Sequence, residues 1–148
     1  MNNDKSNDQV QELSGAVQVF EQALAGFRAN DPLPWIALLD EDAVLELPFN
    51  PPGKPKRLAS KAEILAYYQT TPGRIDFNSF TDVLIHPMLD PDWVVAELTA
   101  SGTVQTTGET YNNSYVVVLQ TRGGRICLQR DYFNPLTAIG APGQEESA

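Results

Sequence analysis

The chain has 148 residues, a length that suits one domain with a core and one internal cavity. Its formal net charge of -9 argues against nucleic acid or an anionic membrane as a partner, because both require a basic patch. The single cysteine, Cys127, excludes an intramolecular disulfide, and no apolar run approaches the ~20 residues of a membrane span. We therefore expect a cytoplasmic protein that needs no cofactor.

The N-terminal third predicts two helices. Residues 1–12 are polar and are expected to form a disordered tail. Beyond them, apolar side chains at 4-3-4-3 spacing predict an amphipathic helix that packs against a flat partner: Leu13, Val17, Phe20, Leu24 and Phe27. Pro34 suits the first turn of a second, short helix, which carries Trp35, Leu38 and Leu39.

One strand and a third helix are expected next. Residues 43–48 are mostly apolar and end in proline, which is typical of an edge strand. A stiff, proline-rich loop over residues 49–57 follows. Ser60 and Glu63 then form a capping box, in which each side chain satisfies a backbone N–H at a helix start. The sequence predicts a third helix from this point to about residues 71–73.

The remainder of the chain reads as strands, with a hairpin signal at Gly123-Gly124 before the last one. Apolar and polar residues alternate most clearly over residues 94–104. The four expected strands cover residues 75–85, 94–104, 111–121 and 125 onward. This order predicts an α+β domain over residues 13–140, a curved mixed or antiparallel sheet wrapped around three helices, with a flexible tail over 141–148.

Several short motifs lie in the order and spacing of a known family. They are Glu41-Asp42-Ala43-Val44, Pro51-Pro52-Gly53, Asn113-Ser114-Tyr115-Val116, Gly124-Arg125-Ile126 and Arg130-Asp131-Tyr132-Phe133-Asn134-Pro135. Together they resemble the SnoaL-like branch of the NTF2-like superfamily. The resemblance implies a conical fold with an apolar pocket, and a homodimer formed through the outer face of the sheet.

Two groups within that superfamily point to Asp131. Limonene-epoxide hydrolase has a similar last strand, in which the aspartate of Arg-Asp-Tyr-Phe is catalytic. The phenazine-biosynthesis A/B proteins have Arg-Glu-Phe-x-Asn-Pro there, with the glutamate as acid/base. Both positions correspond to Asp131, so the resemblance implies that Asp131 is the catalytic residue.

The chain departs from the hydrolase at the residues that activate water. The arginine and second aspartate of the hydrolase correspond to Leu98 and Ala100, and its tyrosine and asparagine correspond to Leu45 and Leu47. One carboxylate without these partners does not readily orient a nucleophilic water. Epoxide hydrolysis by that mechanism is therefore not expected. Ketosteroid isomerase shares the fold, but its tyrosine and protonated acid have no counterpart recognisable in the sequence.

Strand periodicity alone gives a different orientation for Asp131. It places Ile126, Leu128 and Tyr132 on the core face and Asp131 on the solvent face. The resemblance reverses this assignment: Asp131 then points into the cone, and the other face meets a dimer partner. With that parity, the residues expected around a pocket for a small hydrophobic metabolite are Leu45, Leu47, Leu98, Ala100, Asn113, Tyr115 and Gln129.

Two functions remain open. In the first, a desolvated Asp131 with a raised pKa performs cofactor-free isomerisation, cyclisation or dehydration, while Tyr115 or Asn113 positions the ligand. In the second, the protein binds a metabolite or acts as an accessory subunit without chemistry. Glu97 is expected in an interface salt bridge with Arg130, and His86 in a surface role. One histidine and one distant cysteine predict no metal site.

Overall fold

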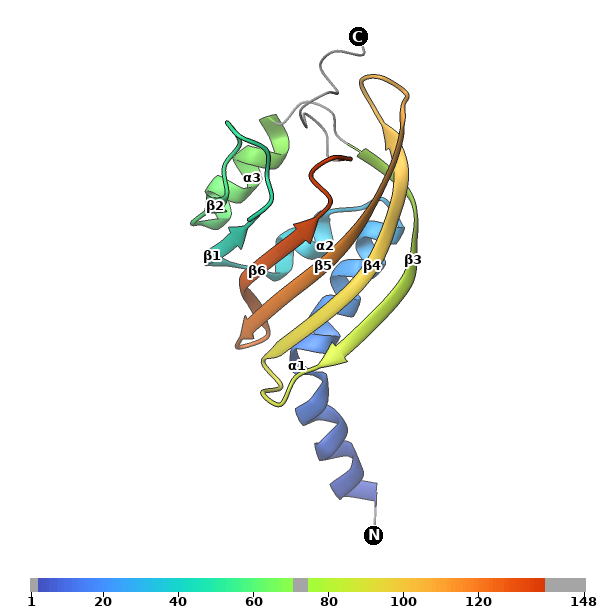
Figure 1. Cartoon of the computed structure of the whole chain (residues 1–148). Coiled ribbons are helices and arrows are strands. Elements are labelled where there is room, and N and C mark those ends of the chain that lie inside the picture. The colour runs from blue at the N-terminus through green and yellow to red at the C-terminus, as the bar shows by residue number, and fades with distance from the viewer. Residues whose placement is uncertain (1–2, 71–74, 138–148) are drawn as a thin grey trace.

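The computed structural model describes residues 3–70 and 75–137, with side chains for residues 15–69 and 75–137. Three helices and six strands follow one another in the order α1 (Asn3–Arg28), α2 (Leu33–Leu38), β1 (Leu39–Glu46), β2 (Arg57–Leu58), α3 (Lys61–Thr70), β3 (Ile75–Pro87), β4 (Trp93–Val104), β5 (Thr110–Arg122) and β6 (Arg125–Phe133). The predicted α+β class is confirmed (Figure 1).

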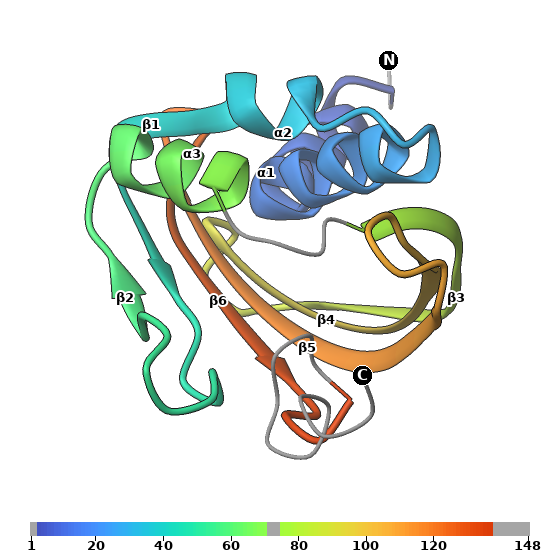
Figure 2. The same ribbon diagram turned by 90° about the horizontal axis from the view of Figure 1, so that it is seen from above.

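All six strands belong to one mixed sheet with the order β2-β1-β6-β5-β4-β3. Neighbouring strands are antiparallel except β1 and β6, which run parallel and are connected in the chain through β2, α3, β3, β4 and β5. The sheet curls, and all three helices lie against its concave side (Figure 2). This arrangement is an open cone whose interior lies between the helices and the sheet.

The amphipathic stripe of α1 explains how the cone is closed. Phe20 and Leu24 are 6% and 5% exposed, and they join the central core with residues from the sheet. The backbone N–H of Ala16 donates to the carbonyl of Pro91 (2.9 Å), which ties α1 to the loop between β3 and β4. The side chain of Leu13 lies outside the described residues, and the disorder expected over residues 1–12 stays a prediction.

The boundary between α2 and β1 lies earlier than expected. The apolar pattern assigns Leu39 to the second helix, but this residue has an extended backbone (φ -68°, ψ 130°) and begins β1. As a strand residue it is 1% exposed in the core. The predicted edge position is also wrong, because β1 lies between β2 and β6. Pro48 follows the end of the strand, where its missing N–H costs no ladder bond.

The capping box at the start of α3 forms with one shift, because Glu63 reaches the N–H of Ala59 and not that of the N-cap residue Ser60. The backbone N–H of Glu63 donates to Ser60 Oγ (3.0 Å), and Glu63 Oε2 accepts from the N–H of Ala59 (2.8 Å). Two orphan backbone donors are thereby satisfied. The predicted end of this helix at residues 71–73 and the tail over 141–148 lie outside the described residues.

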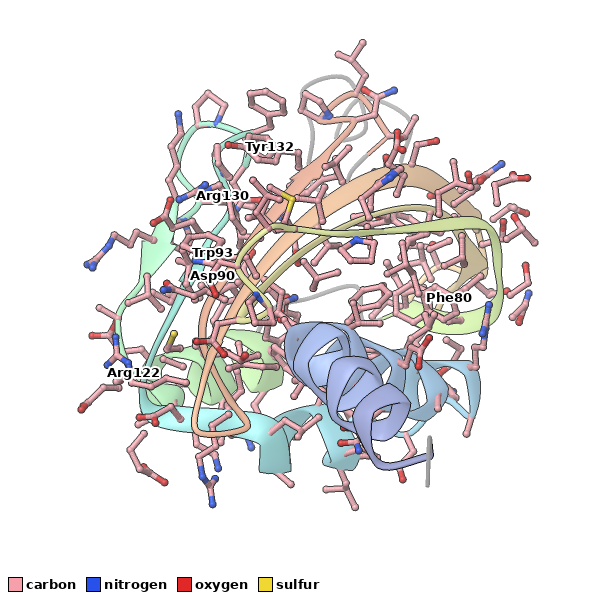
Figure 3. All side chains as sticks on the ribbon, turned by 90° about the horizontal axis from the view of Figure 1, so that it is seen from below. Phe80, Asp90, Trp93, Arg122, Arg130 and Tyr132 are labelled. Atoms are coloured by element: carbon pink, nitrogen blue, oxygen red, sulfur yellow. The ribbon has the colours of Figure 1, made fainter. Side chains whose placement is uncertain are left out.

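A β-bulge in β6 decides which side chains face the cone. Gln120 pairs with Leu128 but Thr121 pairs with Ile126, so Cys127 is an extra residue that has no partner in the ladder. Ile126 is consequently buried in the core, and its predicted place on the dimer face is wrong. After the bulge, Arg130 and Tyr132 lie on the convex face of the sheet (Figure 3).

Candidate active site

A cavity lies between the helices and the concave face of the sheet, in two adjoining chambers of about 390 and 230 Å³. Six residues line both chambers: Phe27, Tyr68, Ile75, Phe77, Tyr115 and Asp131. The volume of the larger one is in the range of small-molecule sites, and most of the side chains that line the two are apolar or aromatic. We call them the larger and the smaller chamber.

Most of the residues predicted for the pocket meet in this cavity. Asp131 and Tyr115 line both chambers, Leu47 lines the larger chamber, and three others line the smaller one: Leu98, Ala100 and Gln129. Leu45 and Asn113 line neither. Leu45 is fully buried in the hydrophobic core, and Asn113 is bonded to other protein groups.

Asp131 is the polar centre of the cavity. It lies opposite Val117 in the sheet and points inward, and the part of its surface that is accessible lines the two chambers. Burial raises the pKa of its carboxyl group to about 6, because the apolar surroundings disfavour the charged form. Gln129 opposes this rise: its Nε2 donates to both carboxylate oxygens (3.1 and 3.2 Å).

A tryptophan fixes the amide that holds Asp131. The indole Nε1 of Trp35 donates to Gln129 Oε1 (2.8 Å), so the amide presents its NH₂ group to Asp131. The sequence predicts Trp35 only as a core or lining residue. The two partners lie 94 residues apart and on different elements. No local pattern in the sequence indicates this contact.

Three tyrosines surround the carboxylate and remain neutral. Desolvation raises the pKa of Tyr68, Tyr111 and Tyr115, and the negative charge of Asp131 adds to the rise; Tyr68 differs from the other two in that it is 45% exposed. The hydroxyl groups of Tyr111 and Tyr115 form a hydrogen bond with each other. The hydroxyl of Tyr68 makes no hydrogen bond within residues 15–69 and 75–137, so it is available to a ligand. Tyr111 lies four residues before Tyr115 on β5, so both side chains are on the same face of the strand. This spacing could have predicted from the sequence that Tyr111 also faces the cavity.

Asn113 anchors the chain after β6. Its Oδ1 accepts from the backbone N–H of Asn134 (2.9 Å), and its Nδ2 donates to the carbonyl of the same residue (3.1 Å). A third contact joins Nδ2 to the Tyr111 hydroxyl (3.3 Å). The amide group is thus occupied by the protein, while Asn113 itself is only 3% exposed.

The charged residues of the convex face pair differently from the expectation. The expected partner of Glu97 is Arg130, but within the chain Glu97 meets His86 (Nε2 to Oε2, 2.7 Å). Arg130 Nε instead donates to Glu46 (3.0 Å), its neighbour across the parallel β1–β6 pair. The alternation of β6 and the parallel pairing explain the change, because Glu46 lies directly beside Arg130 in the register.

Neither a metal cluster nor a membrane helix is found in the part of the chain that the structure describes. No group of three or more His, Cys, Asp or Glu residues there is placed to hold a metal ion. None of the helices over residues 3–70 and 75–137 has the length and apolar character to cross a bilayer.

Comparison with known proteins places this cavity in a family. The SnoaL-like domain model matches residues 20–129. YesE of Bacillus subtilis (strain 168), an uncharacterized protein, is 39% identical over 132 residues, which cover 89% of this chain and 90% of YesE. The crystal structure of a presumed isomerase from Bacillus subtilis has a TM-score of 0.79 at 39% identity, over 89% of this chain and 95% of that chain.

More distant structures share the fold. Delta 5-3-ketosteroid isomerase from Mycobacterium sp. has a TM-score of 0.66 at 23% identity, over 83% of this chain and 95% of that chain. A presumed polyketide cyclase from Xanthomonas campestris, an LEH-like epoxide hydrolase from M. tuberculosis and a phenazine biosynthesis-related protein from Pseudomonas aeruginosa have the same NTF2-like cone at 22%, 24% and 16% identity. The resemblance seen in the sequence is confirmed, and the chain belongs to the SnoaL-like family.

Proposed function

We propose that the protein is a cofactor-free acid/base enzyme that isomerises, cyclises or dehydrates a small, largely apolar carbonyl compound. One observation carries this proposal: Asp131, with its pKa raised to about 6, shares both chambers with the available hydroxyl of Tyr68. A carboxylate in an apolar cavity is a general base near neutral pH. A neutral hydroxyl beside it donates to the oxygen on which negative charge develops.

The chemistry requires no other group. Asp131 takes a proton from the carbon next to the carbonyl, and the enolate oxygen that forms accepts a hydrogen bond from Tyr68. The protonated Asp131 then returns the proton at another position of the same molecule, or to a leaving group. General acid/base catalysis of this kind contributes roughly 10²- to 10⁴-fold, and one oxyanion donor roughly 10²- to 10³-fold.

The relatives support the same class of reaction. The structures that share the fold include a delta 5-3-ketosteroid isomerase and a presumed polyketide cyclase, both at under 25% identity, and a presumed isomerase at 39% identity. Epoxide hydrolysis by two carboxylates is not part of the proposal. Asp131 is the only carboxylate among the described residues that line the cavity, and Leu98 and Ala100 occupy the positions of the other charged groups.

A binding protein without catalysis is the second candidate. The observation that favours it is the number of polar groups already bonded to the protein: Gln129 to Trp35 and Asp131, and Tyr115 to Tyr111. In that case Asp131 accepts a hydrogen bond from a ligand and transfers no proton. The cavity itself is equally suited to both candidates.

Proton exchange separates the two without knowledge of the natural substrate. Deuterium uptake from D₂O by a neutral cyclic ketone such as 2-tetralone is followed by NMR with the full chain. We expect the native protein to accelerate exchange, Asp131→Asn to abolish the acceleration, and Tyr68→Phe to lower it about 10²-fold. Glu21→Gln, an exposed change on α1, is the matched control. Acceleration that persists in Asp131→Asn overturns the catalytic role.

We also propose a homodimer in which the convex face of the sheet is covered. Val95, Val116, Val118 and Leu128 are only partly buried on that face in the single chain. Sedimentation of the native protein and of Val118→Glu is expected to give a dimer and a monomer, respectively. A native monomer contradicts the proposal.

A further inference from the structure

Four of the ten positively charged residues of this acidic chain lie in one short segment, which borders the cavity through Lys54. The sequence has ten Lys and Arg residues against a formal net charge of -9, and four of the ten fall within eight residues. These are Lys54, Lys56, Arg57 and Lys61. They occupy the loop between β1 and β2, the strand β2 itself and the first residue of α3. Such a cluster favours a locally positive potential in a chain that is acidic overall.

The loop that carries Lys54 is held in one conformation. The amide Nδ2 of Asn50 donates to the carbonyl of Pro55 (2.6 Å), and the N–H of Lys54 donates to the carbonyl of Pro51 (3.1 Å). The N–H of Leu47 donates to the carbonyl of Lys56 (2.9 Å), which closes the base of the loop. Gly53 has a φ of 88°, a value that glycine adopts without a steric cost. The backbone of the loop at Lys54 is therefore held in place by the protein itself.

The two chambers differ in the polar groups that they offer. Lys54 and Asn50 line the larger chamber with Asn30 and Gln69, and Lys54 is the only cationic residue among the described residues that line either chamber. The smaller chamber is bounded mainly by aliphatic and aromatic side chains, and its polar groups centre on Asp131 and its partner Gln129. The cavity thus runs from a cationic region, past the candidate base, into an apolar end.

From this polarity we infer that the ligand carries an anionic group at one end. This inference rests on the proposed function and adds a substrate class to it. A carboxylate, sulfonate or phosphate group of the ligand accepts a charge-assisted hydrogen bond from Lys54, with Asn50 beside it. The uncharged, apolar remainder extends past Asp131 into the smaller chamber. The opposite orientation is disfavoured, because it places the anion against the carboxylate of Asp131 and in apolar surroundings.

Two fluorescent probes that differ in one charged group test the inference. 1-Anilinonaphthalene-8-sulfonate is apolar with a sulfonate, and N-phenyl-1-naphthylamine is its uncharged parent. We titrate both into the full native chain, Lys54→Gln and Lys54→Arg, with Lys56→Gln as the control because Lys56 is exposed and does not line the cavity. Melting curves establish that each variant is folded.

Lys54→Gln is expected to weaken binding of the sulfonate about tenfold, the effect of one hydrogen bond to a charged group, and to change binding of the parent less than about twofold. Lys54→Arg is expected to restore binding of the sulfonate probe. Added salt is expected to reduce the difference in affinity between the two probes. Lys56→Gln is expected to change neither. In a second experiment, decanoate and decanol compete with the parent probe for the cavity. Tighter binding of decanoate than of decanol shows that the preference extends to carboxylates.

If Lys54→Gln weakens binding of both probes equally, or of neither, the inference that the ligand carries an anionic group at Lys54 is wrong. In that case continued binding of the parent leaves the proposed function standing, because the apolar cavity still takes a ligand. If the native chain binds neither probe, the cavity admits no apolar ligand and both proposals fall. An effect of Lys56→Gln as large as that of Lys54→Gln also contradicts a specific contact, since it indicates only a general attraction of the basic segment.

Discussion

Replacement of Asp131 by asparagine should make the protein more stable at neutral pH. The pKa of Asp131 is about 6 in the folded chain, above its ordinary value of 3.8. Between these two values the folded state binds more protons than the unfolded state, so the free energy of unfolding falls as pH rises. This contribution to stability is fully present below about pH 4 and is lost above about pH 6. The asparagine side chain of the variant carries no charge and avoids the loss.

The size of the effect follows from the two pKa values. A rise from 3.8 to about 6 corresponds to at most about 3 kcal/mol, at about 1.36 kcal/mol for each pKa unit. Two terms reduce this limit. Water in the cavity solvates the carboxylate, and asparagine keeps only one of the two hydrogen bonds that Gln129 donates. We expect a gain of about 1 to 3 kcal/mol at pH 8, or roughly 3 to 10 °C in Tm.

Thermal melts of the native chain and Asp131→Asn between pH 3.5 and 8 measure this gain. The difference in Tm is expected to be near zero or slightly negative at pH 3.5, and to grow through pH 4 to 6. Glu41→Gln, at an exposed position, gives the background of removing one carboxylate. If Asp131→Asn is less stable than the native chain at pH 8, or if its gain in stability does not depend on pH, the conclusion that Asp131 is a desolvated carboxylate with a raised pKa is wrong.

Three further changes test the contacts around the site. Trp35→Phe leaves Gln129 Oε1 without its donor, which should cost about 1 to 3 kcal/mol of unfolding free energy. It also frees the amide to turn its NH₂ group away, so NMR titration should show a higher pKa for Asp131. Asn113→Ala removes both bonds to the chain after β6 and should cost about 1 to 3 kcal/mol by urea unfolding. Gly102→Ala places a Cβ 2.3 Å from a backbone oxygen of β3, which should separate β3 from β4 and cost roughly 3 kcal/mol, also by urea unfolding.

Each of these has a control on the same element or of the same type. Trp93→Phe is a tryptophan change on the convex face, and it should leave the pKa of Asp131 unchanged. Asn112→Ala lies beside Asn113 but is exposed, and Thr103→Ala lies beside Gly102 on the outer face; both should cost less than about 1 kcal/mol. If a control variant changes the measured quantity as much as the variant it is matched to, the contact that this variant was designed to test is contradicted.

The sequence predicted the parts of the fold that depend on local pattern. Alternation over residues 94–104 gives β4 and its buried face, from Val94 to Val104, because a half-buried strand requires that period. The capping box gives the start of α3 for a similar reason. The end of α2 was predicted less well, since Leu38 and Leu39 are apolar and suit a helix or a strand equally.

The site depended on information that is not local. The inward direction of Asp131 came from the family resemblance, whereas periodicity alone gave the opposite face. The bond between Trp35 and Gln129 joins a short helix to the last strand, and only the assembled fold brings them together. The occupied amide of Asn113 was equally out of reach, because its partners are backbone atoms of Asn134. Polar residue types were found in the sequence, but their partners were not.

The extra residue in β6 has a consequence for how this strand tolerates change. Before Cys127 the strand contributes Ile126 to the core, and after it the same strand turns Asp131 toward the cavity. Ile126 and Asp131 are five positions apart, so a regular strand would place them on opposite faces, and the bulge at Cys127 brings both to the inner face. The bulge at Cys127 thus determines which face of β6 carries Asp131. Deletion of Cys127 removes the bulge and leaves a regular strand that still has both side chains inside. Both deletion and substitution of Cys127 should therefore keep Asp131 directed into the cavity.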